Sequence, residues 1–163
     1  MNPVNQISPD IVSNKAAPDI SALNGLEQLR LIFADPKRAP TGMGKTMGFD
    51  HVEIEDGRVV FGATPHEGVY NPIGTVHGGF AATLLDSCVG CAVHSKLKAG
   101  QGYTTLELKV AYHRALTKDT GPVRAEGVVV QMGRRAAFAE GKLTDLNGRL
   151  YATATSTLLV FDK

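Results

Sequence analysis

Asp86 is the residue whose place in the sequence most strongly suggests chemistry. It lies within residues 80–98, a segment rich in alanine and leucine that is apolar around most of its circumference when drawn as a helix. Such a pattern predicts a buried helix. A carboxylate on a buried helix loses its hydration unless another group uses or satisfies it. Asp86 is therefore a candidate general base or nucleophile.

Two glycines stand at the expected start of this helix. Gly78 and Gly79 follow His77, where the first backbone N–H groups of a helix have no partner within the helix. Glycine lets a ligand approach these groups, which lie at the positive end of the helix dipole and can stabilise an oxyanion. The alternative is that Gly78 and Gly79 only permit close packing of the helix start.

The spacing of the two features limits how they can act together. Gly78 and Asp86 are eight residues apart, which separates them by roughly 12 Å along a helix axis. They cannot serve one carbonyl group from the same chain. If both belong to one site, Asp86 must meet the Gly78 end of a second copy, with two antiparallel helices about a twofold axis. The spacing thus favours a homodimer with two shared sites.

The surrounding sequence predicts the elements that would position these residues. Residues 52–61 alternate in polarity around Asp56-Gly57, which is typical of a β-hairpin. After the helix, turn-forming residues separate four further expected strands, at 103–113, 123–131, 136–143 and 150–161. Their short connections favour antiparallel pairing. We therefore expect an α+β fold in which one antiparallel sheet wraps around one long central helix.

The N-terminal region has a different composition. Residues 1–19 contain three prolines among polar residues, which predicts a flexible tail. From Ile20 the apolar residues recur at helical spacing until Pro36, which predicts a short amphipathic helix. We expect residues 20–163 to form a single domain. The length of 163 residues suits one hydrophobic core.

Charge and cysteine content exclude several classes of function. Seventeen Lys and Arg against sixteen Asp and Glu leave a formal charge of +1, so no overall field favours nucleic acid or an anionic membrane. No apolar run approaches the roughly 20 residues that span a bilayer, and we expect a cytoplasmic protein. Cys88 and Cys91 lie in the middle of the expected helix, a position that favours packing over redox chemistry. We expect no metal and no cofactor.

Four segments together carry a resemblance to a known family. They are Asn71-Pro-Ile-Gly-Thr-Val-His-Gly-Gly79, Leu84-Leu-Asp86, the strand Tyr103-Thr-Thr-Leu-Glu-Leu-Lys-Val-Ala-Tyr112 and the closing strand that starts at Gly148. With these segments, residues 47–161 resemble the PaaI-like branch of hotdog-fold acyl-CoA thioesterases, the phenylacetyl-CoA and 4-hydroxybenzoyl-CoA type. The resemblance implies a hotdog fold and hydrolysis of an aryl-, arylacetyl- or medium-chain acyl-CoA. It also implies a homodimer, often assembled as a dimer of dimers.

The resemblance assigns roles to individual positions. Asp86 matches the general base or nucleophile, and the amide of Gly78 matches the group that binds the thioester oxygen. Asn71 and His77 match residues that shape and orient the site. Thr105 matches a hydroxyl residue that positions water, and strand alternation places it on the same face as Glu107 and Lys109. The sequence leaves open whether Asp86 attacks the thioester or deprotonates water.

Local basic residues are expected to bind the phosphates of CoA. The resemblance places Arg114, at the end of one strand, and the turn with Gly133, Arg134 and Arg135 along the CoA channel. Gly79 completes the expected substrate-binding residues. The alternative is that these arginines are only solvated surface residues.

Two other functions share the expected fold. A non-catalytic acyl-CoA-binding module would give no reason to retain Asp86. A hotdog hydratase or dehydratase needs a histidine and an acid around the β-carbon of one acyl group, whereas His77 immediately precedes the glycines. Both alternatives remain, because the fold alone does not decide the function.

Overall fold

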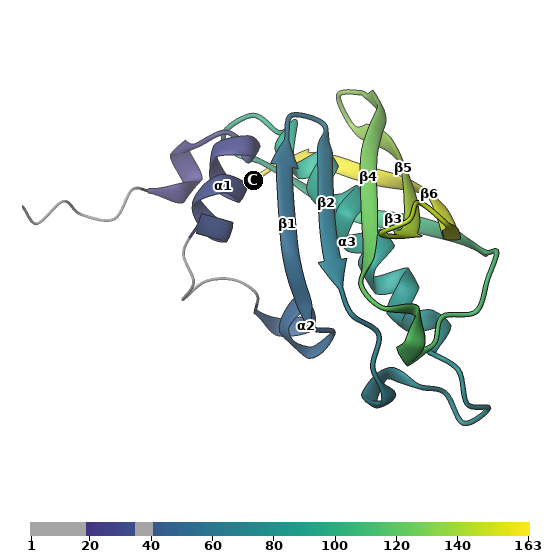
Figure 1. Ribbon diagram of the computed structural model, residues 1–163. Helices are drawn as coiled ribbons and strands as arrows, with labels where there is room; N and C mark the ends of the chain where they lie inside the picture. Colours follow the sequence, from purple (N-terminus) through teal and green to yellow (C-terminus); the bar gives the residue numbers. More distant parts are fainter. Residues whose placement is uncertain (1–18, 35–40) are drawn as a thin grey trace, which may run out of the picture.

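The structure, a computed structural model, describes residues 19–34 and 41–163. It has a six-stranded antiparallel sheet in the order β1-β2-β4-β5-β6-β3, curled around a long helix, α3 (Figure 1). The strands are β1 (Phe49–Glu55), β2 (Arg58–Ala63), β3 (Gln101–Tyr112), β4 (Val123–Met132), β5 (Ala136–Asp145) and β6 (Leu150–Asp162). The helices are α1 (Gly25–Ala34), α2 (Gly42–Thr46) and α3 (Gly78–Ser95), with short 3-10 turns at Ile20–Ala22, Glu67–Val69 and Lys118–Thr120.

This architecture confirms the predicted α+β hotdog fold. The hairpin, the helix and the four following strands all form, although β3 pairs with β6 at the edge of the sheet and not with β4. The tail expected over residues 1–19 lies, apart from Asp19, outside the described residues. Within the described residues, no helix is long and apolar enough to cross a membrane.

Two glycines in the sheet, Gly127 and Gly141, allow α3 to lie directly against it. A Cβ on Gly127 of β4 would come within 2.4 Å of the Cys88 carbonyl carbon, and one on Gly141 of β5 within 3.0 Å of Leu85. These glycines explain why the helix backbone approaches β4 and β5 so closely. Burial raises the pKa of the Cys88 thiol and raises that of Cys91 to about 12, so both thiols stay protonated at neutral pH. Their chemistry is that of packed, inert side chains.

One stripe of α3 is not fully covered by its own chain. The side chains on this stripe are only half-buried: Ala82, Thr83, Asp86, Ser87 and Cys91. The opposite face is buried in the core, with Phe80, Leu84, Leu85 and Val89. The expectation of a fully buried helix is therefore wrong for the stripe that carries Asp86.

A β-bulge divides β3 into two halves. The pairing of β3 with β6 shifts between Thr105 and Glu107, so Leu106 is an extra, unpaired residue in β3. Beyond it, the side chains that face α3 are at even positions and no longer at odd ones. Tyr103 lies on the inner face before the bulge, and Leu108 and Val110 lie there after it. The expectation that Thr105 shares a face with Glu107 and Lys109 is wrong, because simple alternation fails at a bulge.

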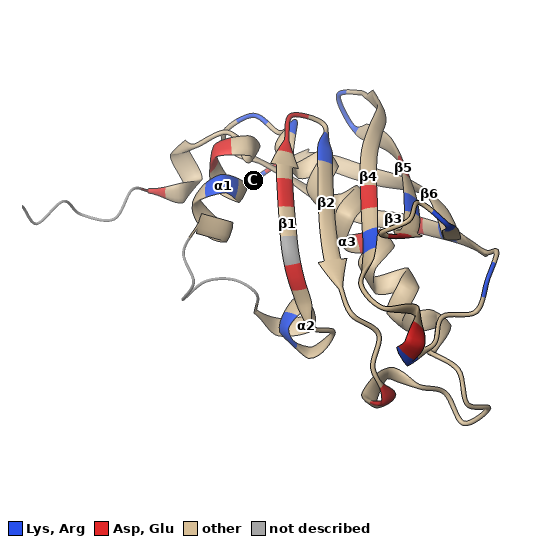
Figure 2. Cartoon of the chain, viewed as in Figure 1, with Lys and Arg blue, Asp and Glu red and all other residues tan. Residues whose placement is uncertain are grey.

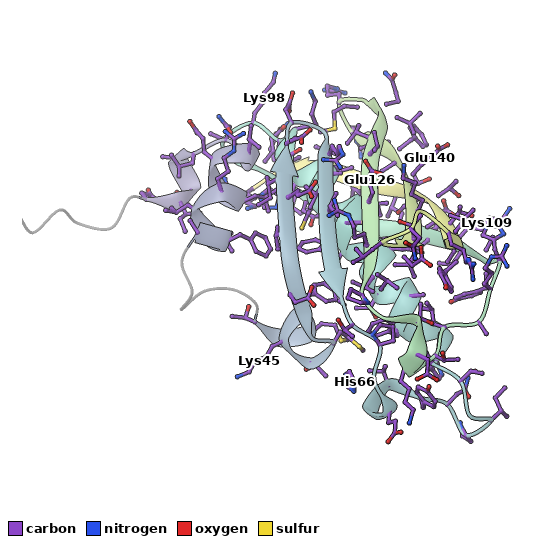
Figure 3. All side chains as sticks on the ribbon, in the orientation of Figure 1. Lys45, His66, Lys98, Lys109, Glu126 and Glu140 are labelled. Atoms are coloured by element: carbon purple, nitrogen blue, oxygen red, sulfur yellow. The ribbon has the colours of Figure 1, made fainter. Side chains whose placement is uncertain are left out.

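Glu107 and Lys109 instead belong to the outer face of the sheet. The Thr157 hydroxyl donates to Glu107 at 3.1 Å, and Lys109 lines an outer hollow with Glu140. Figure 3 shows the labelled side chain of Lys109 extending away from α3. Figure 2 shows acidic residues on β1, a basic residue on β2, and an acidic and a basic residue next to each other on β4. There Arg58 binds Glu126 at 2.6 Å and Glu53 at 3.2 Å, so the charges are balanced locally.

Candidate active site

His77 begins helix α3. Its Nδ1 accepts a hydrogen bond from the Gly79 N–H at 2.8 Å, which makes His77 the N-cap. The Gly79 amide, expected to help bind the substrate, is therefore already paired. By contrast, no acceptor within the described residues takes the Gly78 N–H. Of the two candidate amides, Gly78 is the one that remains open to a ligand oxygen.

Both glycines also have a packing role. A Cβ on Gly79 would come within 2.9 Å of His77 Nδ1, and one on Gly78 within 3.1 Å of the Tyr112 ring. The hydroxyl of Tyr112 donates to the Gly78 carbonyl oxygen at 3.0 Å. The alternative interpretation, that Gly78 and Gly79 permit close packing of the helix start, is thus correct in that respect. This packing role does not exclude oxyanion binding by Gly78, because its N–H stays free.

A cavity of about 340 Å³ opens at this end of α3. His77, Gly78, Tyr112 and Arg114 line it. The structure therefore brings three of the residues expected from the sequence together. Tyr112 was missed, since its position on the inner face depends on the bulge in β3.

Asn71 acts on the loop that leads to His77. Its Oδ1 accepts from the backbone N–H groups of Ile73 at 3.1 Å and Thr75 at 3.2 Å, while its Nδ2 donates to the Thr75 hydroxyl at 3.0 Å. These bonds close a tight turn of the Asx type. Among the described residues, Asn71 makes no side-chain hydrogen bond to Gly78 or Asp86. Its observed role is to shape the approach to the helix.

Asp86 lies at a second cavity, further along α3. The Thr105 hydroxyl donates to Asp86 Oδ1 at 3.1 Å, a bond that was not predicted from the sequence. No described residue donates to Asp86 Oδ2, which leaves one carboxylate oxygen for a ligand or water. The cavity has a volume of about 310 Å³, and its other walls include Phe33, Phe61 and Tyr103. A half-buried carboxylate with a free oxygen beside a cavity with aromatic walls is suited to act as a base or nucleophile.

The two cavities share none of their lining residues. This separation agrees with the roughly 12 Å rise between Gly78 and Asp86 along the helix. One chain therefore holds two half-sites, one with the open amide and one with the carboxylate.

The expected arginine turn lies apart from both half-sites. The Gly133 N–H donates to the Ala136 carbonyl at 2.8 Å and closes the turn between β4 and β5. Arg134 and Arg135 line a separate hollow of about 490 Å³ together with Gln101 at the start of β3. Figure 1 shows this turn at the opposite end of the molecule from the loop that enters α3. Of the three arginines expected to bind CoA, Arg114 alone lines a candidate half-site of the same chain.

The described residues contain no group of three or more His, Cys, Asp or Glu side chains placed to hold a metal ion. The chemistry available at the two half-sites is that of a carboxylate, a hydroxyl and a backbone amide at a helix N-terminus. This set matches the needs of acyl transfer to water.

Comparisons with known proteins agree with this geometry. A 1,4-dihydroxy-2-naphthoyl-CoA hydrolase of Listeria monocytogenes is 27% identical over 122 residues, covering 75% of this chain and 98% of the relative. A variant of the phenylacetic acid degradation protein PaaI from Thermus thermophilus superposes with a TM-score of 0.64 and 27% identity, covering 71% of this chain and 96% of that one. A Streptococcus mutans protein bound to acetyl-CoA gives a TM-score of 0.67 and 25% identity, covering 79% and 98%.

The sequence profile of the thioesterase superfamily matches residues 73–152. This range contains the open amide of Gly78, the carboxylate of Asp86 and the hydroxyl of Thr105. The chain therefore belongs to the thioesterase superfamily and has its hotdog fold.

Proposed function

We propose that the protein hydrolyses an acyl-CoA thioester in a site shared by two copies of the chain. Asp86 and Thr105 come from one copy, and the Gly78 amide comes from the other. The observation that carries the proposal is the pair of half-sites in one chain, each with one unpaired reactive group. The name of the Listeria relative and the ligand of the Streptococcus protein support CoA as the thiol part of the substrate.

The edge strand β3 provides a way to join the half-sites. No strand of the described residues lies beside its outer edge, and Leu106 and Tyr112 on it are 59% and 55% exposed. Exposed edges of this kind pair readily with another strand. Thr105 contacts Asp86 near one end of β3, and Tyr112 contacts Gly78 at the other end. Antiparallel pairing about a twofold axis near the middle of β3 would therefore bring each Asp86 towards the Gly78 of the second copy.

The same pairing accounts for the separated arginines. Arg134 and Arg135 lie beside the start of β3, whereas Arg114 lies just beyond its end. In an antiparallel pair, the start of one strand meets the end of the other. Arginines from both copies would then surround one entrance and bind the phosphates of CoA.

The reaction can follow either of two routes at this site. Asp86 can attack the thioester carbonyl carbon, which expels the CoA thiolate and leaves a mixed anhydride for water to cleave. Alternatively, Asp86 takes a proton from a water that attacks the carbonyl directly. In both routes, the Gly78 N–H and the helix dipole stabilise the oxyanion. The Thr105 hydroxyl holds Asp86 and the attacking water in place.

Release of the CoA thiol tests the proposal. Aromatic, arylacetyl and medium-chain acyl-CoAs are offered to the wild type, to Asp86→Asn and to Asp56→Asn. Asp56 is a matched control because it is an exposed acid bound to Lys96, outside both half-sites. We expect kcat to fall about a thousandfold or more in Asp86→Asn, with Asp56→Asn unchanged.

Two outcomes would contradict the proposal. Wild-type turnover in a folded Asp86→Asn variant would remove Asp86 from the chemistry. Tight binding of acyl-CoAs without thiol release from any of them would instead indicate a non-catalytic binding module.

A further inference from the structure

The cavity beside Asp86 lies between the two edges of the curled sheet. Strands β1 and β3 are these edges, and both line the cavity, through Phe49 on β1 and through Tyr103 and Thr105 on β3. The half-buried stripe of α3 lines it as well, and so do α1 and α2, which lie beside β1 (Figure 1). A group bound next to Asp86 is therefore bounded by elements from both ends of the sheet order.

The chemistry of the lining differs between these elements. Helix α3 and strand β3 contribute polar groups, among them the Asp86 carboxylate and the Thr105 hydroxyl. The side chains from α1, β1 and β2 are hydrocarbon: Ile32, Phe33, Phe49 and Phe61. The CoA part of a thioester carries phosphates, which are costly to desolvate against such a wall. The acyl group is therefore the part of the substrate that this wall suits.

The Phe33 ring packs against a neighbour that is itself fixed. Its centroid lies 5.5 Å from that of Phe61, and the Phe49 ring packs on Phe61 as well, at 5.2 Å. Phe61 is buried in the core, whereas Phe33 is half-buried and belongs to α1. Because the core is closely packed, Phe33 cannot move inward to make room for a longer acyl group.

Helix α1 holds Phe33 in place from the other side. The Gly25 N–H donates to the Leu97 carbonyl at 2.9 Å, and the Gln28 side chain pairs with His94 at 3.1 Å. Any side chain at position 25 would overlap the His94 carbonyl oxygen, so α1 and α3 are in direct backbone contact. The position of the Phe33 ring is therefore fixed by the docking of α1 as well as by the core.

We propose that Phe33 sets the longest acyl group that the site accepts. The inference rests on the proposed hydrolysis at Asp86 and adds a specificity-determining residue to it. The cavity, at about 310 Å³, is at the lower end of the range for ligand pockets, so a long chain must meet its walls. Helix α1 lies outside residues 73–152, the range that matches the superfamily. The limit on acyl length thus comes from a part of the chain that the superfamily profile does not cover.

Straight-chain acyl-CoAs from butanoyl to dodecanoyl measure this limit. The kcat/KM for thiol release is determined for the wild type, Phe33→Ala and Phe33→Trp. We expect Phe33→Ala to accept chains about four carbons longer, with a gain of about tenfold or more on the first chain that the wild type rejects. Phe33→Trp should shorten the limit, with a loss of about tenfold on the longest chain that the wild type accepts.

Gln28→Ala is the matched control on the same helix. It removes the pair with His94 and so loosens the docking of α1, but position 28 does not line the cavity. We expect Gln28→Ala to keep the wild-type limit. An equal lengthening in Gln28→Ala and Phe33→Ala would mean that the docking of the helix, and not the Phe33 ring, sets the limit. An unchanged limit in both Phe33 variants, or a shift of both in the same direction, would also overturn the inference.

Binding measurements separate this inference from the proposed hydrolysis. Dissociation constants for the same series are measured by calorimetry on Asp86→Asn and on Asp86→Asn/Phe33→Ala, which need no turnover. If the wild type releases no thiol but the chain length at which binding weakens moves with Phe33, hydrolysis is wrong and the role of Phe33 stands. If thiol is released but that chain length is the same in both variants, hydrolysis stands and the role of Phe33 is wrong.

Discussion

The two half-sites on α3 differ in how the chain builds them. At the first, the reactive group is a backbone N–H, and His77 shapes the helix start from the position next to Gly78. At the second, the reactive groups are side chains, and Asp86 depends on Thr105 from a strand that follows α3 in the chain. A backbone group is placed by local conformation, whereas a side-chain pair requires two elements to meet. The first half-site is thus mostly a local structure, and the second is a product of the whole fold.

Mixed dimers test most directly whether the two half-sites act together. Asp86→Asn and Gly78→Val subunits are each expected to be inactive, because the first removes the carboxylate and the second places a bulky side chain against Tyr112, beside the Gly78 amide. In a mixed dimer, one of the two shared sites is intact. Random mixing should therefore restore about a quarter of wild-type turnover, a gain of several hundredfold over either parent, measured as thiol release. No recovery in confirmed mixed dimers would mean that the half-sites do not complement each other.

Gly78→Ala probes the backbone half-site alone. The new Cβ meets the Tyr112 ring at 3.1 Å, and the ring must shift by a few tenths of an ångström. Small displacements in an active site are costly, so we expect kcat/KM to fall about ten- to a hundredfold. Circular dichroism checks that the variant is folded. Full activity would show that the position of this amide is not critical.

Thr105→Val probes the side-chain half-site. It removes the hydrogen bond to Asp86 at nearly constant volume, and we expect kcat to fall about tenfold. Thr104→Val is the matched control, since Thr104 is the exposed neighbour on the other face of β3. Equal effects of the two substitutions on kcat would contradict a specific role for Thr105.

Tyr112→Phe should have the smallest effect. The hydroxyl bonds only to the Gly78 carbonyl, at 3.0 Å, and Tyr112 is 55% exposed. Loss of one such bond changes kcat/KM by about two- to fivefold. Amide exchange at the start of α3, followed by NMR, should rise in parallel. A loss as large as that of Gly78→Ala would instead give Tyr112 a direct part in binding the substrate.

The sequence was sufficient for the parts of the site that depend on local pattern. The apolar run with one acid predicted α3 and singled out Asp86, and the residues before it predicted the helix start at Gly78. Thr105 was singled out as a site residue by the resemblance, but its bond to Asp86 was not predicted.

The parts that were missed depend on non-local geometry. Glu107 and Lys109 were placed on the wrong face, and Tyr112 was not considered, because alternation gives no sign of a bulge. The aromatic wall from Phe33 could not be foreseen, since it requires α1 to dock on α3 through Gly25. The sequence likewise could not show that Arg114 lies apart from the turn with Arg134 and Arg135, because this separation depends on how the sheet curls.

The bulge in β3 also affects how sequences of this kind are compared. Positions before Leu106 and positions after it follow opposite parity, so β3 contains two registers joined by one residue. In a relative that lacks the extra residue, the side chain at the start of α3 would come six positions after the equivalent of Thr105, and not seven as for Tyr112, so an ungapped alignment would match it to Ala111. An alignment that spreads this one-residue gap over neighbouring positions would then transfer roles to side chains on the wrong surface. Functional assignments along β3 should therefore be anchored separately at Thr105 and at Tyr112.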